Sequence, residues 1–403
     1  MSRPGLLFYC QHSLGLGHLA RSLALADGLA AHFDVVLLNG GRLPTTVKIP
    51  PDVRVVNLPP LGHDADYELV SHDPSMEVHD ACVRRRELVL SALAQTSPSV
   101  VLIEMYPFGR KKFEFELLPL LDAVQAIGAD RPKVLCSLRD ILVSERRDQA
   151  RHDERASQRV NRYFDAVVMH SDPSFATLDG SFRPVTPIRV PVHYTGFVAP
   201  PTPAGSTRQR AATRVDRLLV SAGGGMVGEP LFRAAVDVHA RLAERTGLTT
   251  TVVAGPFLPE PVWRWLQAKA ADSPTLDTVR QVDDLSEQMR CSVITLSQCG
   301  YNTTMDILRA GTPALVVPFS EGKEDEQRRR AERLAAMGAL RVTSDLDADR
   351  LLDDLCELAR FQPAPVSLDL SGRATTARII AEIAGAHDIR TTPLAAPLNG
   401  AFA

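Results

Sequence analysis

Near its start the chain reads Leu6-Leu7-Phe8-Tyr9-Cys10-Gln11-His12-Ser13-Leu14-Gly15-Leu16-Gly17-His18-Leu19-Ala20-Arg21, and this stretch decides the fold. An apolar run stops at a Gly-x-Gly-His turn, and leucines at helical spacing follow it. This pattern predicts the first β-strand, glycine loop and helix of an α/β domain. Gly15 and Gly17 would let backbone N–H groups approach a ligand, and a helix N-terminus favours an anion. His18 adds a group that can move a proton near neutral pH.

The rest of the chain repeats this organisation, because short apolar runs alternate with helical stretches in both halves. The last strand of the first half is expected at 187–190, and a second strand and glycine loop begin at Arg217. Strands that alternate with helices predict parallel sheets covered on both faces, with ligands bound where the strands end. The predicted organisation is an N-terminal Rossmann-like domain 1–195, a linker 196–215, a C-terminal Rossmann-like domain 216–372, a final helix 373–386 packing back on the first domain, and a flexible tail 387–403.

Composition narrows the class of protein. A chain of 403 residues is too long for one ordinary core, and a net charge of −3 argues against a nucleic-acid partner. We find no run of about 20 apolar residues that could cross a bilayer and no signal peptide. The six cysteines form no C-x-x-C pair, as expected for reduced cytosolic residues. We therefore expect a cytoplasmic protein, with contact to the inner face of the membrane left open.

Both glycine loops superficially match a dinucleotide fingerprint, the second as Gly223, Gly224 and Gly225. A nicotinamide site also needs an acidic residue at the end of the second strand, to bind the ribose hydroxyls. Neither half has one, because those strands end in Asn39-Gly40 and in Gly255-Pro256. A dehydrogenase is therefore disfavoured.

The densest polar cluster follows the apolar run 291–296 and opens a helix. Its backbone N–H groups and polar side chains could hold a diphosphate, and Asp306 could reach ribose hydroxyls one turn further on. A buried strand then leads to further carboxylates and an amide at the next strand end. The candidate donor residues here are Ser297, Gly300, Tyr301, Asn302, Thr303, Asp306, Glu326 and Gln327.

In order, these motifs resemble the GT-B glycosyltransferases of family 28, the group of the lipid II-forming N-acetylglucosaminyltransferase and of bacterial predicted glycosyltransferases. The matches are the Gly-His loop, the second glycine loop, Ser297-x-x-Gly300 with Asp306, and Gly311-x-Pro-Ala-Leu-x-x-Pro followed by Gln327. The resemblance implies metal-independent transfer from a nucleoside-diphosphate sugar, with UDP the expected carrier and no resident cofactor. Asp306 departs from the usual longer Glu, and 300–303 differs from the lipid II enzyme.

The resemblance also implies that the second domain holds the nucleotide, while the first supplies the acceptor site and the base. An acceptor hydroxyl needs a base within about 3 Å, and His18 is the candidate. Glu104 ends the strand 99–104 and could orient His18 or accept the proton itself. Gly15, Gly17, Arg110 and Arg139 are the acceptor-side candidates, for a small-molecule or lipid-linked acceptor.

Three alternatives remain open from the sequence. A nucleotide-sugar hydrolase shares the Gly-x-Gly-His loop and would use His18 to activate water. A UDP-sugar epimerase of the same fold is a second possibility, and a non-catalytic nucleotide-sugar-binding protein is a third. Oligomeric state is not indicated by the sequence.

Overall fold

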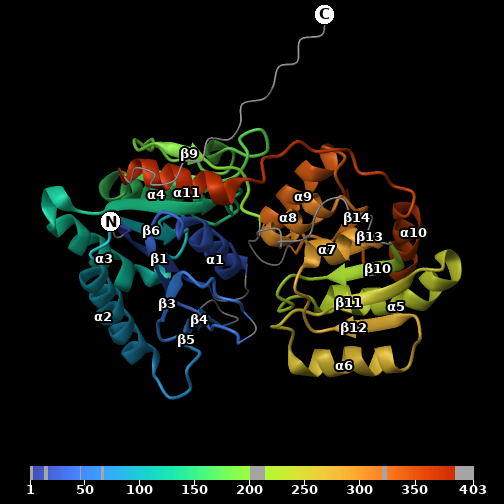
Figure 1. The fold of residues 1–403 in the computed structure, drawn as a ribbon. Helices are drawn as coiled ribbons and strands as arrows, with labels where there is room; N and C mark the ends of the chain where they lie inside the picture. The colour runs from blue at the N-terminus through green and yellow to red at the C-terminus, as the bar shows by residue number, and fades with distance from the viewer. Residues whose placement is uncertain are drawn as a thin grey trace, which may run out of the picture.

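The computed structural model describes residues 3–12, 17–45, 47–64, 68–199, 214–319 and 325–385. Figure 1 shows two α/β domains side by side, each built around its own parallel sheet. The first domain carries a seven-stranded sheet of order β3-β2-β1-β6-β7-β8-β9, and the second a six-stranded sheet of order β12-β11-β10-β13-β14-β15. Both orders place the first strand of the domain near the middle of its sheet, as in doubly wound folds.

The strands of the first domain are β1 (Gly5–Cys10), β2 (Asp34–Asn39), β3 (Val53–Asn57), β4 (Leu61–His63), β5 (Leu69–Ser71), β6 (Val100–Glu104), β7 (Lys133–Arg139), β8 (Ala166–His170) and β9 (Val192–Tyr194). The short strands β4 and β5 form a separate antiparallel pair. The helices of this domain are α1 (Gly17–Leu29), α2 (Val78–Thr96), α3 (Glu114–Ala126) and α4 (Gln149–Tyr163), with α11 (Gly372–Ile383) added from the end of the chain.

The strands of the second domain are β10 (Val215–Ser221), β11 (Thr249–Val253), β12 (Leu276–Val279), β13 (Ser292–Ser297), β14 (Ala314–Val316) and β15 (Arg341–Val342). Its helices are α5 (Glu229–Thr246), α6 (Glu260–Ala271), α7 (Leu285–Arg290), α8 (Tyr301–Ala310), α9 (Glu326–Ala336) and α10 (Ala348–Leu358). Among the described helices none is long and apolar enough to cross a membrane.

Alternation along β1 produces two cores, one on each face of the first sheet. Leu7 and Tyr9 pack into the cluster that contains residues of α2, α3 and α4. Leu6 and Phe8 point to the opposite face, where α1 and α11 lie. Successive side chains of a strand point to opposite faces, so a strand covered on both faces reads as a continuous apolar run.

Helix α11 joins the last part of the chain to the first domain. Ala377 and Ile380 belong to the core that includes α1, and Arg373 donates to Asp27. Residues 200–213 of the expected linker, residue 386 of the expected final helix and the expected tail 387–403 lie outside the described residues.

The expected strand at 187–190 is wrong. The strand that follows β8 is β9, Val192–Tyr194, which pairs in parallel with 167–169. The apolar letters Ile188 and Val190 alternate with Pro187, Arg189 and Pro191, and the two prolines have no N–H for a ladder. The strand therefore starts only after Pro191.

Candidate active site

His18 and Glu104 meet at the end of the first sheet. His18 is the second residue of α1, and Glu104 is the last residue of β6, which pairs directly with β1. His18 Nδ1 lies 2.6 Å from Glu104 Oε1. The Glu104 side chain is fully buried, whereas 26% of the His18 side chain is exposed. An ionised carboxylate can only accept, so Nδ1 carries the proton and Nε2 is left as an acceptor.

Two arginines also contact Glu104. Arg21, one turn along α1 from His18, donates to Glu104 Oε1 at 2.5 Å. Arg110 donates to Glu104 Oε2 at 3.1 Å. Arg21 was not among the site residues predicted from the sequence. Its position three residues after His18 on the same helix nevertheless places both side chains on one face.

These contacts set the protonation states. Burial lowers the pKa of His18, and this outweighs the opposite effect of Glu104, so the imidazole is neutral at pH 7. Burial alone would raise the pKa of Glu104, but the hydrogen bond from His18 and the charges of Arg110 and Arg21 hold that pKa well below its usual range. The pair is therefore a neutral imidazole oriented by a buried carboxylate, which is the arrangement of a general base.

In the second domain, two neighbouring strands end in serines. Ser221 of β10 and Ser297 of β13 are register partners. Both hydroxyl oxygens are buried, and neither has a hydrogen-bond partner among the described residues. Buried polar atoms without partners are uncommon, and here they lie beneath the two loops expected to bind a ligand.

The glycine loop after β10 packs backbone against backbone. A Cβ on Gly225 (φ +88°) would stand 2.2 Å from the carbonyl oxygen of Ala254, and Phe257 N–H donates to the Gly224 carbonyl. A Cβ on Gly223 would lie 3.6 Å from Thr303 Oγ1 of α8. The loop thus adjoins the first turn of α8, as the sequence order of these motifs suggested.

The N-terminus of α8 is open. A Cβ on its capping residue Gly300 would meet nothing within 4 Å, and no acidic residue lies in the first turn. The first N–H groups of a helix have no partners within the helix. This terminus can therefore accept an anion such as a diphosphate.

Asp306 lies one turn further along α8. Burial raises its pKa to about 7, while Arg309 lowers it and Asp284 raises it further. Asp284 caps α7 by accepting from the N–H of Glu287. The Asp306 carboxyl therefore adjoins the loop between β12 and α7, which no motif in the sequence had marked.

Gln327 and Glu326 begin α9. Gln327 Oε1 accepts from the N–H groups of Cys299 (3.1 Å) and Phe319 (3.2 Å), so it joins the loops that follow β13 and β14. Glu326 Oε1 accepts from Arg139 of the first domain at 2.8 Å. Arg139 and Glu326 thus neutralise each other across the domain boundary.

Tyr301 is reassigned by its contacts. Its ring is buried, its hydroxyl donates to the His170 carbonyl at 3.0 Å and accepts from the N–H of Val198 at 2.9 Å. Arg21 lies over the ring, 5.1 Å from its centroid. The Tyr301 side chain therefore belongs to the contact between the domains, and we no longer expect it to bind the donor.

Other contacts fix the two domains together. Asn302 Nδ2 donates to the Gly17 carbonyl at 3.1 Å. Arg330 of α9 forms two hydrogen bonds of 2.8 Å with Asp140, and both side chains are buried. Gly15 lies outside the described residues.

Comparison with known proteins agrees with this architecture. Residues 219–371 match the glycosyltransferase family 28 C-terminal domain. The calicheamicin glycosyltransferase CalG4 aligns with 96% of each chain (TM-score 0.57, 17% identity), and MurG of Acinetobacter baumannii with 94% of this chain and all of that one (0.55, 15%). At identities this low, the two structural matches show only that the fold is shared.

Curated relatives match over a shorter region. A Mannheimia succiniciproducens protein is 31% identical over 157 residues, 38% of this chain and 43% of that one. A Brucella melitensis protein is 25% identical over 206 residues, half of this chain and 52% of that one. Both are named UDP-N-acetylglucosamine–N-acetylmuramyl-(pentapeptide) pyrophosphoryl-undecaprenol N-acetylglucosamine transferase. The chain spans about half the length of these relatives.

Together, the sheet topology and the structural matches show a GT-B fold of two Rossmann-like domains. Within this fold, residues 219–371 are similar to the glycosyltransferase family 28 C-terminal domain.

Proposed function

We propose that this protein transfers a sugar from a nucleoside-diphosphate sugar to an acceptor hydroxyl, with His18 as the base. The observation that carries the proposal is the His18–Glu104 pair in the first domain, which the Gly17–Asn302 contact joins to the open N-terminus of α8 in the second. UDP is the proposed carrier, because the curated relatives are named for UDP-N-acetylglucosamine. We expect no divalent metal and no resident cofactor to be required.

The reaction needs three things that these residues can supply. His18 Nε2 takes the proton from the acceptor hydroxyl, and Glu104 stabilises the imidazolium that forms. The acceptor oxygen forms a bond to the anomeric carbon as the bond to the diphosphate oxygen breaks. The N–H groups at the start of α8 stabilise the charge on the departing diphosphate.

The acceptor is proposed to bind on the first-domain side. The names of the curated relatives describe a pyrophosphoryl-undecaprenol acceptor, which supports a lipid-linked or small-molecule acceptor here. For a lipid-linked acceptor the protein would work at the cytoplasmic face of the membrane.

The donor site can be tested by a change at Gly300. Gly300→Leu is expected to weaken nucleotide-sugar binding by at least about tenfold, because the side chain would fill the open space before α8. Gly300→Ala is the matched control and should bind far better, since one methyl group meets open space. Calorimetric titration with a panel of nucleoside-diphosphate sugars measures both. Equal affinity of the wild type and Gly300→Leu would contradict the donor site.

Asp306 gives the donor site an expected pH dependence. Its carboxyl, with a pKa of about 7 in the unliganded protein, accepts more strongly from ribose hydroxyls when it is ionised. Affinity for a nucleotide sugar should therefore rise between pH 6 and pH 8, whereas Asp306→Asn should show a flat profile. A diphosphate diester does not titrate in this range, so titrations at four pH values isolate the protein group.

The raised pKa of Asp306 also makes the stability of the folded protein depend on pH. The pKa of Asp306 is higher in the folded protein than the value of about 3.9 expected for the unfolded chain. Its contribution is fully present below the unfolded pKa and is lost as the pH rises through about 7. Asp306→Asn should therefore gain stability relative to wild type at pH 8 but not at pH 4. A constant difference in urea midpoint across this range would contradict the assignment.

A further inference from the structure

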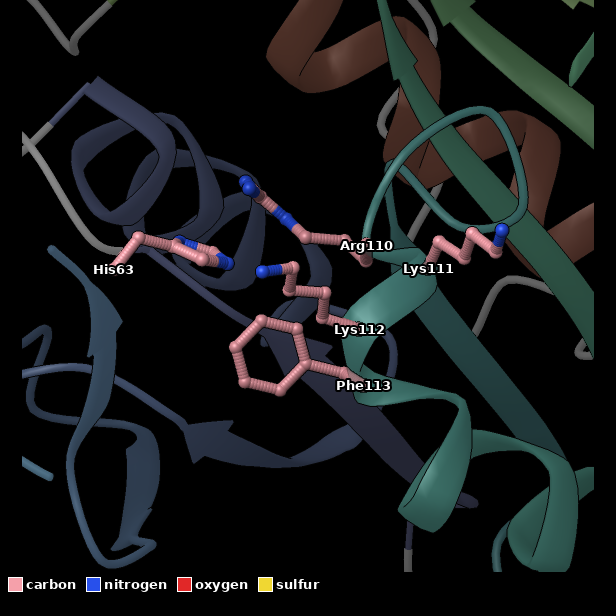
Figure 2. Close-up of a pocket in the computed structure, with 5 residues that line it drawn as sticks. All are labelled: His63, Arg110, Lys111, Lys112 and Phe113. Carbon is pink, nitrogen blue, oxygen red and sulfur yellow. The ribbon is translucent and has the colours of Figure 1, made fainter. Parts of the chain in front are cut away.

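A cationic pocket adjoins the His18–Glu104 pair. His63 from the end of β4, Arg110, and the residues of a short 3₁₀ turn, Lys111–Phe113, line it. In Figure 2 the side chains of His63, Arg110 and Lys112 converge on one space above the Phe113 ring, whereas the Lys111 side chain extends away from it. The rings of His63 and Phe113 pack edge to face at 6.0 Å.

Arg110 connects this pocket to the base. Its guanidinium donates to Glu104 Oε2, and only 16% of the side chain is exposed. Its Nε is buried and has no hydrogen-bond partner among the described residues. A guanidinium carries five N–H donors, so Arg110 can contact Glu104 and still donate to a second anion.

The ion pair that Lys112 forms with Glu68 is exposed to solvent. Lys112 pairs with Glu68 at 3.0 Å, but 76% of the Glu68 side chain is exposed, so this pair is readily exchanged. Burial lowers the pKa of His63, and the charges of Lys112 and Arg110 lower it further against the weaker effects of Asp64 and Glu68. Among the described residues of this pocket, Nε of Arg110 is the buried donor that remains unused, so we take Arg110 as the cation that would bind a second anion.

We propose that this pocket binds an anionic group of the acceptor, a phosphate or a carboxylate, and that the bound anion makes His18 a stronger base. The second half of the inference rests on the proposed function. In the unliganded protein Glu104 is shared, with Oε1 contacted by His18 and Arg21 and Oε2 by Arg110. An anion on Arg110 offsets the charge of that arginine, so Glu104 stabilises an imidazolium at His18 more effectively.

This arrangement has a functional consequence. Base strength at His18 would be low while the pocket is empty and would rise only when an anionic acceptor is seated. Activation of a stray water by His18 would then be disfavoured in the absence of acceptor, which protects the donor from hydrolysis. The groups that face His18 in this balance are Glu104, Arg110 and Arg21.

Inorganic phosphate is the probe for the binding site. We expect saturable changes in the ring resonances of His18 and His63 in the full chain when phosphate replaces chloride at constant ionic strength. Arg110→Gln should weaken phosphate binding by at least about tenfold, because a charge-assisted contact is lost. Arg110→Lys should retain part of the affinity, and Arg86→Gln, a matched change at an exposed arginine of α2 outside the pocket, should retain all of it.

The link to the base has its own readout. Saturating phosphate should raise the pKa of His18 in the wild type and leave it unchanged in Arg110→Gln, with near-ultraviolet circular dichroism confirming that the variant is folded. Absence of saturable binding, or equal binding by wild type and Arg110→Gln, would overturn the site even if nucleotide sugars bind the second domain normally. Arg110-dependent flotation with phosphatidylglycerol vesicles, without any response to phosphate, would also overturn it and assign the cations to a membrane surface.

Discussion

His18→Ala is expected to lower the rate of sugar transfer by about 10²–10⁴-fold, the range over which a positioned general base acts. Neutral His18 has Nδ1 directed at Glu104 2.6 Å away, which leaves Nε2 to take the acceptor proton. Alanine at position 18 removes the nitrogen that takes the proton and leaves unchanged the second-domain residues proposed to bind the nucleotide sugar. Donor affinity should therefore stay within about twofold of wild type, so that the loss appears in the turnover rate alone.

A control on the same segment separates chemistry from folding. His32 follows the end of α1 and is also partly buried, but it lies at the far end of the helix from Glu104. His32→Ala should keep its transfer rate near that of wild type. Transfer by His18→Ala at a rate close to that of His32→Ala would show that another group is the base.

Asp140→Ala is expected to lower the free energy of unfolding by about 3–5 kcal/mol, because it leaves the Arg330 charge buried and unpaired. The Asp140 side chain is fully buried, and that of Arg330 is 1% exposed. Arg330 also donates to the Cys299 carbonyl at 2.9 Å. Removal of the Asp140 carboxylate is therefore expected to disturb the loop before α8 as well. Weaker donor binding should accompany the lower stability.

The exposed pair of Glu145 and Arg328 is the matched control for this change. It also joins the first domain to α9, at 3.0 Å, but the Glu145 side chain is 62% exposed. Glu145→Ala should therefore cost at most about 1 kcal/mol. Urea unfolding followed by tryptophan fluorescence reports the second domain, which contains Trp263 and Trp265. A cost for Asp140→Ala as small as that of Glu145→Ala would contradict the proposed role of the buried pair.

Strong local periodicity made much of the fold predictable. The apolar run, glycine loop and helix at the start of each domain appear as β1 with α1 and as β10 with α5. Weaker elements escaped prediction for identifiable reasons. Helix α7 has only six residues, and β12 has a single buried side chain, Leu276, so neither shows a clear period.

The part of the candidate site that lies at the carboxyl ends of strands could be predicted from the sequence. Residues at the carboxyl ends of neighbouring parallel strands must lie close together, and this is why His18 and Glu104 could be paired from the sequence. Partners contributed by distant segments could not be inferred in the same way. Tyr301 resembles a donor residue in sequence, but His170 and Val198, more than a hundred residues earlier in the chain, occupy its hydroxyl.

The fate of the donor sugar tests the central claim most directly. The measurement follows a nucleoside-diphosphate sugar, labelled in the sugar and chosen as the one the protein binds most tightly, with a bacterial lipid extract as the source of acceptor. The proposed function predicts that the label moves to a larger product while nucleoside diphosphate is released in equal amount, and that His18→Ala binds the donor without this transfer. Rapid release of free sugar with or without the extract would contradict it and identify a hydrolase.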